Sequence, residues 1–249
     1  MNLDHPAFAP YRSLIDTLEP ACAIPSLDAL NTQAAALGIR NAGGLPIRFF
    51  APEGRLSARD YETRILQTGQ VPTRAGNWHD VLNALVWLRF PHFKATLNAA
   101  HGAAIATEPD TQRGRRRDAL TMLDESGVWV ISRDPALSQL LANRAWHELF
   151  WDARPYLETG MRFVVVGHAL LEKALAPFAS MTGKCLMLHA DSLDPDAAEA
   201  QAVATLGVID TPRQLPPLPV QGIPGWDEAN SDASYYANPS VFRPAVQVA

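Results

Sequence analysis

Apolar positions recur with a helical period through much of the first half of the chain. Residues 8–40 are rich in Ala and Leu, and residues 57–69 carry Ser57 where a helix can be capped and Gly69 where it can end. Residues 194–207 carry the clearest local signal, with Asp at the cap, Pro at the first helical position and Gly at the end. The pattern predicts a helical N-terminal half and a further helix towards the C-terminus.

Shorter apolar runs predict the strands of a small mixed sheet. Residues 43–52, "GGLPIRFFAP", predict one strand between a glycine pair and a proline. Residues 118–132, "DALTMLDESGVWVIS", hold two apolar runs on either side of Ser126 and Gly127. That pattern favours a β-hairpin.

Residues 161–191 read as a strand, a helix and a second strand. Such a crossover usually makes its two strands parallel, so we expect one βαβ unit. Ligand sites in open α/β sheets favour the carboxyl ends of parallel strands. His189 and Asp191, which end the second strand, are therefore expected beside His168, which follows the first.

The last segment, residues 211–249, changes character. It holds repeated prolines, large side chains such as Trp226, Tyr236 and Phe242, and no usable period. The large aromatic side chains favour an ordered strap across the domain over a floppy tail. We therefore expect a single domain, residues 1–249, of the α+β class. It has a helical N-terminal half, a small mixed β-sheet with one βαβ unit, and an extended Pro-rich C-terminal strap.

Composition limits the class of protein and its location. Hydrophobic residues make up 47% of the chain and charged residues 19%, which fits a globular protein. The net charge of -5 argues against a generic nucleic-acid coat. Cys22 and Cys185 cannot form a disulfide framework or a Cys-only zinc site. The N-terminus does not read as a signal peptide, and no run of about 18 apolar residues predicts a spanning helix, so we expect a cytoplasmic protein without a membrane partner.

A polar stripe interrupts the apolar segment over residues 78–89. At 3.6 residues per turn, His79, Asn83 and Trp87 share one stripe, which Asp80 flanks. A solvent-facing stripe rarely carries Trp, so another segment is expected to cover it, and its polar groups must then find partners. Two interpretations stand side by side: a polar network that fixes the helix, or a cleft wall that offers an imidazole and a carboxylate.

The next segment repeats this spacing. Lys94, Asn98 and His101 stand at i, i+4 and i+7. Taken alone, such a stripe is more typical of a solvated helix face, and we expect it to face solvent.

Two residue pairs can carry metal or acid–base chemistry. His168 and Glu172 stand at i, i+4 on one helix face, a spacing that can present two ligands to a divalent metal. The alternative is a histidine near a helix cap that pairs with a neighbour. Asp124 and Glu125 sit at the predicted hairpin turn, where adjacent carboxylates can hold a cation, act as acid and base, or simply suit the turn.

The run "QRGRRRD" places Arg115, Arg116 and Arg117 after Arg113. Clustered guanidiniums suit phosphate or carboxylate groups, although most such runs are solvated loops. The sequence contains no G-x-S-x-G elbow, P-loop, G-x-G-x-x-G or H-E-x-x-H motif. Nucleotide-fuelled chemistry, dinucleotide redox chemistry and ordinary serine hydrolysis therefore lose their usual support.

Four separated motifs carry a resemblance to a known family. "VPTRAGNWHDVLNALVWLRFPHFKATLN", "RRRDALTMLDESGVWV", "VVVGHALLEK" and "LPVQGIPGW" together resemble a bacterial family catalogued as domain of unknown function 3025, over residues 43–244. The resemblance implies a single-domain bacterial protein whose Pro-rich strap belongs to the domain. It implies no reaction, cofactor or catalytic residue.

Two functions remain open from the residues, with a small preference for the first. The first is a metal-dependent hydrolase that acts on a small anionic substrate, in which a divalent ion activates water and a carboxylate is the general base. Its candidate residues are His79, Asp80, Asp124 and Glu125 for catalysis, and His168 and Glu172 for the metal. The second is a non-catalytic binding protein for an anionic metabolite or RNA. The residues expected to contact a bound ligand are Asn83, Trp87, Arg115, Arg116, Arg117 and Trp226.

Overall fold

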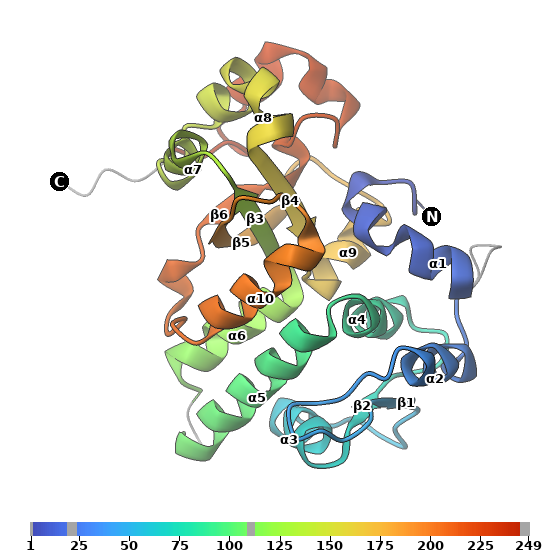
Figure 1. Ribbon diagram of the computed structural model, residues 1–249. Helices are drawn as coiled ribbons and strands as arrows, with labels where there is room; N and C mark the ends of the chain where they lie inside the picture. Colours follow the sequence, from blue (N-terminus) through green and yellow to red (C-terminus); the bar gives the residue numbers. More distant parts are fainter. Residues whose placement is uncertain (1, 19–23, 109–112, 245–249) are drawn as a thin grey trace.

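The computed structural model describes residues 2–18, 24–108 and 113–244 and shows helices packed around a small sheet (Figure 1). The α-helices are α1 (Arg12–Leu18), α2 (Leu27–Ala36), α3 (Ala58–Thr68), α4 (Trp78–Arg89), α5 (Pro91–Thr107), α6 (Arg115–Ser126), α7 (Pro135–Ala142), α8 (Arg154–Gly160), α9 (His168–Ala174) and α10 (Pro195–Leu206). The strands are β1 (Arg48–Phe50), β2 (Gln70–Pro72), β3 (Gly127–Ser132), β4 (Met161–Val165), β5 (Thr182–His189) and β6 (Pro217–Pro219). The short 3-10 segments are Pro6–Tyr11, Pro212–Gln214, Val220–Gly222, Glu228–Ser231 and Ala233–Ala237, and Glu148–Asp152 forms a π-helix. Cys22 lies outside the described residues.

Local signals place the helices where the sequence predicts them. Ser57 caps α3 by accepting a hydrogen bond from the Asp60 amide, and Gly69 ends α3 in the left-handed conformation. Asn77 caps α4 in the same way, and Asp194 caps α10. These caps satisfy amides that have no partner inside the helix. With these helices beside two small sheets, the predicted α+β class is confirmed.

The larger sheet has the strand order β4-β3-β5-β6, and this order corrects the βαβ unit predicted over residues 161–191. The chain forms a βαβ unit elsewhere, since β1 and β2 pair in parallel with α3 between them. β3 pairs with β4 antiparallel and with β5 parallel, so β4 and β5 are not neighbours and run in opposite directions. His189 pairs with Ser132 at the end of β3, whereas Val165 of β4 pairs with Val128 near its start. His189 and His168 therefore lie at opposite ends of the sheet, and the prediction that they converge is wrong. β3 lies between the two strands, antiparallel to β4 and parallel to β5.

The predicted β-hairpin over residues 118–132 is also wrong. Its first half is helix α6, whose Ala119, Leu120 and Leu123 are buried, and only its second half is strand β3. The apolar positions of the first half share a helix face, and the Ser-Gly pair marks the junction between helix and strand. Asp124 and Glu125 consequently stand in the last turn of α6.

The core joins the sheet to the helices. Trp129 of β3 packs against Phe90 and Phe93, which stand where α4 ends and α5 begins. α5 lies against α3, α4, α6 and α10, and α9 lies against α4 and α6. This packing brings α3, α4, α5, α6 and α9 together on one side of the sheet (Figure 1).

The described part of the C-terminal segment, residues 211–244, lies along the domain. β6 pairs antiparallel with β5, and Tyr236 and Phe242 are buried against each other with their ring centroids 5.1 Å apart. Trp226 packs edge-on against His5 near the N-terminus. In the described part of the chain, no helix is both long enough and apolar enough to cross a bilayer.

Candidate metal centre

Two glycines allow the junction of α6 and β3 to lie against the junction of β4 and α9. Gly127 begins β3 and Gly167 follows β4, and the amides of Val166 and Gly167 both donate to the Gly127 carbonyl at 2.9 Å. A Cβ atom on Gly167 would lie 2.4 Å from the Gly127 nitrogen, so a larger residue there would force the backbones apart. This close approach sets His168, the first residue of α9, directly against the end of α6.

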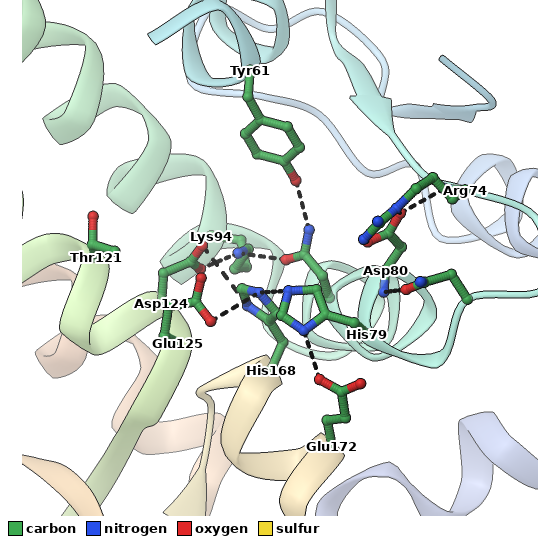
Figure 2. A network of polar contacts seen from close by, with 12 residues as sticks. Tyr61, Arg74, His79, Asp80, Lys94, Thr121, Asp124, Glu125, His168 and Glu172 are labelled. Atoms are coloured by element: carbon green, nitrogen blue, oxygen red, sulfur yellow. Dashed lines mark hydrogen bonds and ion pairs between the residues drawn. The ribbon is translucent and has the colours of Figure 1, made fainter. Parts of the chain in front are cut away.

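The cluster that results consists of His79 from α4, His168 from α9 and Glu125 from α6 (Figure 2). One ligand atom from each lies within 4.8 Å of the other two. The two Nε2 atoms are 3.1 Å apart, and Glu125 Oε2 is 3.7 Å from His168 Nε2. These three donors point into one small volume.

Carboxylates face the other side of both imidazoles. His79 Nδ1 lies 2.8 Å from Glu172 Oε2, and His168 Nδ1 lies 3.8 Å from Asp124 Oδ2. The Nδ1 atom of His168 is buried and has no hydrogen-bond partner at the distances found among the described residues. A histidine that binds a metal through one nitrogen usually donates its other N–H to such a carboxylate.

Burial keeps His168 neutral. Its side chain is enclosed, and this loss of water lowers the pKa of His168 to about 4, against a smaller opposing effect of Asp124. A neutral imidazole retains a lone pair for a metal. Burial and the nearby Asp124 raise the pKa of Glu125.

Lys94 is the cation of the cluster. Its ammonium is buried, forms an ion pair with Asp124 and donates to Asn83 Oδ1 at 2.8 Å. Burial opposes ionisation of Asp124, but Lys94 and then His168 outweigh it and lower the pKa of Asp124 to about 2. Asn83 Nδ2 in turn donates to the Tyr61 hydroxyl at 2.7 Å. One buried chain of contacts thus runs from α6 through α5 and α4 to α3.

The stripe of Lys94, Asn98 and His101 was expected to face solvent, and that expectation is wrong. All three residues are buried, because α3 and α6 cover this face of α5. Asn98 donates to the Glu62 carboxylate at 2.7 Å, while Asn98 Oδ1 and His101 Nδ1 find no hydrogen-bond partner in the part of the chain that the structure describes. The spacing of the stripe was visible in the sequence, but the helices that cover it were not.

A pocket of about 880 Å³ opens over the cluster. The residues that line it include His79, Asp124, Glu125 and His168, together with Tyr61, Glu62 and His101. A recess of about 10 Å³, the size of one water molecule, is lined by Tyr61, Glu62, Lys94, Asn98 and His101 among others. Burial, followed by the Asp124 charge, raises the pKa of Glu62 to about 7. Tyr61 and Glu62 carried no signal that sequence reasoning recognised.

Several predicted site residues are not part of the cluster of His79, His168 and Glu125. Asp80 lines the pocket but is bound by Arg74 at 2.8 Å, which lowers the pKa of Asp80 although burial acts in the opposite direction. Trp87 is buried beneath Lys94, whose Nζ lies 5.7 Å from the ring centroid. Trp226 packs against His5 and does not line the pocket.

The three consecutive arginines also lie outside the pocket lining. Arg116 pairs with Asp210 at 2.8 Å, and Arg117 pairs with Glu108 at 3.0 Å. Arg115 is exposed. The guanidiniums that do line the pocket belong to Arg55, Arg74 and Arg113.

The fold and the site define an α+β protein whose helices bring a histidine–carboxylate cluster to the floor of a pocket. The family model described as "Protein of unknown function (DUF3025)" matches residues 47–246. The chain belongs to this family, as its sequence motifs predict. Neither the curated proteins nor the solved structures contain a match to it.

Proposed function

We propose that the pocket is the active site of a metal-dependent hydrolase. A divalent ion, Zn²⁺ in the first instance, is held by His79 Nε2, His168 Nε2 and the Glu125 carboxylate. Zinc accepts imidazole and carboxylate ligands at about 2.0–2.2 Å, so tetrahedral donors stand about 3.3 Å apart. The separations of 3.1 Å and 3.7 Å in the cluster are close to that value.

The main support for this proposal is that the Nε2 atoms of His79 and His168 face each other. Each Nδ1 faces a carboxylate, which favours a proton on both Nδ1 atoms. Both Nε2 atoms are then unprotonated, and their lone pairs oppose each other at 3.1 Å. A cation that binds both lone pairs removes this repulsion and leaves each Nδ1–H directed at its carboxylate.

Each neighbouring residue has a role in this proposal. Glu172 and Asp124 orient the two imidazoles, and Glu172 is therefore a positioning residue and not a ligand. The bound ion supplies an activated water. Glu62, with a pKa of about 7, is suited to accept a proton near neutral pH and return it to the leaving group.

The substrate is a small molecule that carries a negative charge away from the reacting group. Arg74 and Arg113 are already bound to Asp80 and Asp118. Arg55 is exposed, lines the pocket, and has no ion pair or hydrogen bond among the described residues. Its guanidinium can meet a carboxylate of the substrate.

The test is metal binding by the purified protein. After treatment with chelator and dialysis, the wild type is titrated with Zn²⁺, Mn²⁺ and Co²⁺ while bound metal and melting temperature are followed. We expect about one ion per chain and a higher melting temperature, since an ion that binds only the folded state stabilises it. His79→Ala and His168→Ala should abolish binding, and Glu172→Gln should weaken it about 10-fold to 100-fold.

His189→Ala is the matched control, because this exposed histidine lies at the far end of the sheet. It should bind the ion as the wild type does. A wild type that binds none of the three ions would contradict the proposal. So would binding that survives both the His79 and the His168 substitutions.

A further inference from the structure

The orientation of the Asn83 side chain is determined by Lys94. An ammonium group has only donors, so the amide oxygen of Asn83 must face it, at 2.8 Å from Nζ. The amide nitrogen then faces the Tyr61 hydroxyl at 2.7 Å and donates to it. The contact with Lys94 therefore determines that the Tyr61 oxygen accepts the hydrogen bond from Asn83 Nδ2.

No described residue accepts a hydrogen bond from the Tyr61 hydroxyl. Among the described residues, the hydroxyl makes no hydrogen bond other than the one it accepts from Asn83. Tyr61 lines both the pocket and the inner recess. Burial, and then the charge of Glu62, raises the pKa of Tyr61 well above its usual value, so the hydroxyl remains a donor. The Tyr61 hydroxyl can therefore donate a hydrogen bond to a molecule bound in the pocket.

This donor lies close to the proposed metal centre. Asn83 follows His79 by one helical turn, so their Cβ atoms are about 6 Å apart. Figure 2 shows the Tyr61 side chain directed towards the network that contains His79 and His168. A substrate atom bound at the centre can therefore lie within reach of the hydroxyl.

The charges around the centre disfavour a phosphoryl group. Asp124, Glu125 and Glu62 line the same pocket, and a phosphate beside them would be repelled. Phosphoryl transfer relies on several free cationic groups around the phosphate oxygens, but of the described arginines that line the pocket Arg74 and Arg113 are bound to carboxylates and Arg55 alone is not. Acyl transfer needs a neutral donor aimed at one developing oxyanion, which is what Tyr61 offers.

We propose that Tyr61 donates a hydrogen bond to the oxyanion formed during hydrolysis of an acyl group, so that the substrate is an amide or ester. This assignment rests on the proposed metal centre and names the reacting group of its substrate. The substrate's negative charge then belongs to its far end. Tyr61 is a catalytic residue, and Asn83 and Lys94 are positioning residues that act through it.

The proposed hydrolysis passes through a tetrahedral intermediate. The water oxygen bonds to the carbonyl carbon while a proton passes to the Glu62 carboxylate. The π electron pair of the carbonyl moves onto its oxygen, which accepts the hydrogen bond from Tyr61. When that pair returns, the bond from carbon to the leaving nitrogen or oxygen breaks, and the leaving atom takes the proton from Glu62.

The experiment measures acetohydroxamate and inorganic phosphate binding to the zinc-loaded protein by calorimetry. Tyr61→Phe should weaken acetohydroxamate binding about 10-fold to 100-fold, the range expected for one hydrogen bond to a charged group. Its affinity for Zn²⁺ should stay within about 2-fold of the wild type, because Tyr61 is not a ligand. The wild type should bind acetohydroxamate more tightly than phosphate.

Tyr11→Phe is the matched control, because Tyr11 is also buried and its hydroxyl donates to the Val165 carbonyl, yet it does not line the pocket. It should leave both affinities unchanged. Equal acetohydroxamate affinity in the wild type and Tyr61→Phe would overturn the role of Tyr61 while leaving the metal centre intact. Tighter binding of phosphate by the wild type would overturn the acyl substrate even if the variant failed to fold. Failure of the wild type to bind Zn²⁺ would overturn both proposals.

Discussion

Replacement of Lys94 by methionine tests whether the buried network stabilises the protein. Methionine preserves most of the aliphatic side chain and removes only the ammonium, which leaves the Asp124 carboxylate and the Asn83 oxygen without their donor. The side chains of Lys94 and Asp124 are only 5% and 14% exposed, so most of the stabilisation that the ammonium gives the carboxylate is lost. Breaking a buried pair from one side costs about 3–5 kcal/mol.

That loss is a large part of a total stability of about 5–15 kcal/mol. Urea unfolding followed by tryptophan fluorescence should show a lower midpoint at unchanged m-value, and the midpoint shift multiplied by m should equal this loss of free energy. The melting temperature should fall by about 6–20 °C, at about 2–4 °C per kcal/mol for a chain of this size.

Two further variants separate the ion pair from other effects. Lys173→Met removes an exposed lysine from α9 and should change the free energy of unfolding by less than about 0.5 kcal/mol. Asp124→Asn combined with Lys94→Met should be more stable than Lys94→Met alone, because no buried charge is left unpaired. A loss below about 1 kcal/mol in Lys94→Met would refute the argument that this pair is desolvated.

Two other predictions concern acid stability and the glycine contact. Burial lowers the pKa of His168 and His101 to about 4. Between pH of about 6.5 and about 4 the unfolded chain therefore binds more protons at these histidines than the native state does. The free energy of unfolding of the metal-free protein should fall as the pH drops through this range. Glu62 has the opposite effect, because its pKa is raised to about 7 and between pH of about 4.5 and about 7 the native state binds the extra proton. The two histidines and Glu62 together give a net slope of about 1.4 kcal/mol of unfolding free energy per pH unit, and Glu62→Gln should about double this slope in urea unfolding. An unchanged slope would contradict this assignment. Gly167→Ala should lower the free energy of unfolding by more than about 2 kcal/mol and weaken metal binding, because the added Cβ would lie 2.4 Å from the Gly127 nitrogen. Gly54→Ala is the control, because the space around Gly54 is open. Equal stability of these two glycine variants would show that the backbone moves freely there.

Local chemistry in the sequence determined where most helices begin and end. Ser57 and Asp194 cap their helices as predicted, because a cap depends on a side chain and an amide only two or three residues away. The stripe of His79 and Asn83 was likewise predicted from helical spacing alone. Its need for polar partners follows from burial beside an apolar face.

Longer-range relations were decided by the tertiary structure. The direction of β4 relative to β5 depends on β3, a strand from another part of the chain, so a local crossover pattern could not reveal it. Lys94 and His101 became buried only because α3 and α6 cover α5.

The candidate centre shows the same division. Its histidines and carboxylates were recognisable in the sequence by residue type, since few side chains bind metals or transfer protons near neutral pH. Which of them meet was decided by the contact of Gly127 with Gly167, which sets His168 against Glu125, and by the packing of α4 on α9, which adds His79. Glu172 illustrates the difference most directly, because spacing predicted a ligand beside His168 and the structure places its carboxylate on His79. Spacing along one helix orders neighbours on that helix, but only packing between helices determines which groups share a site.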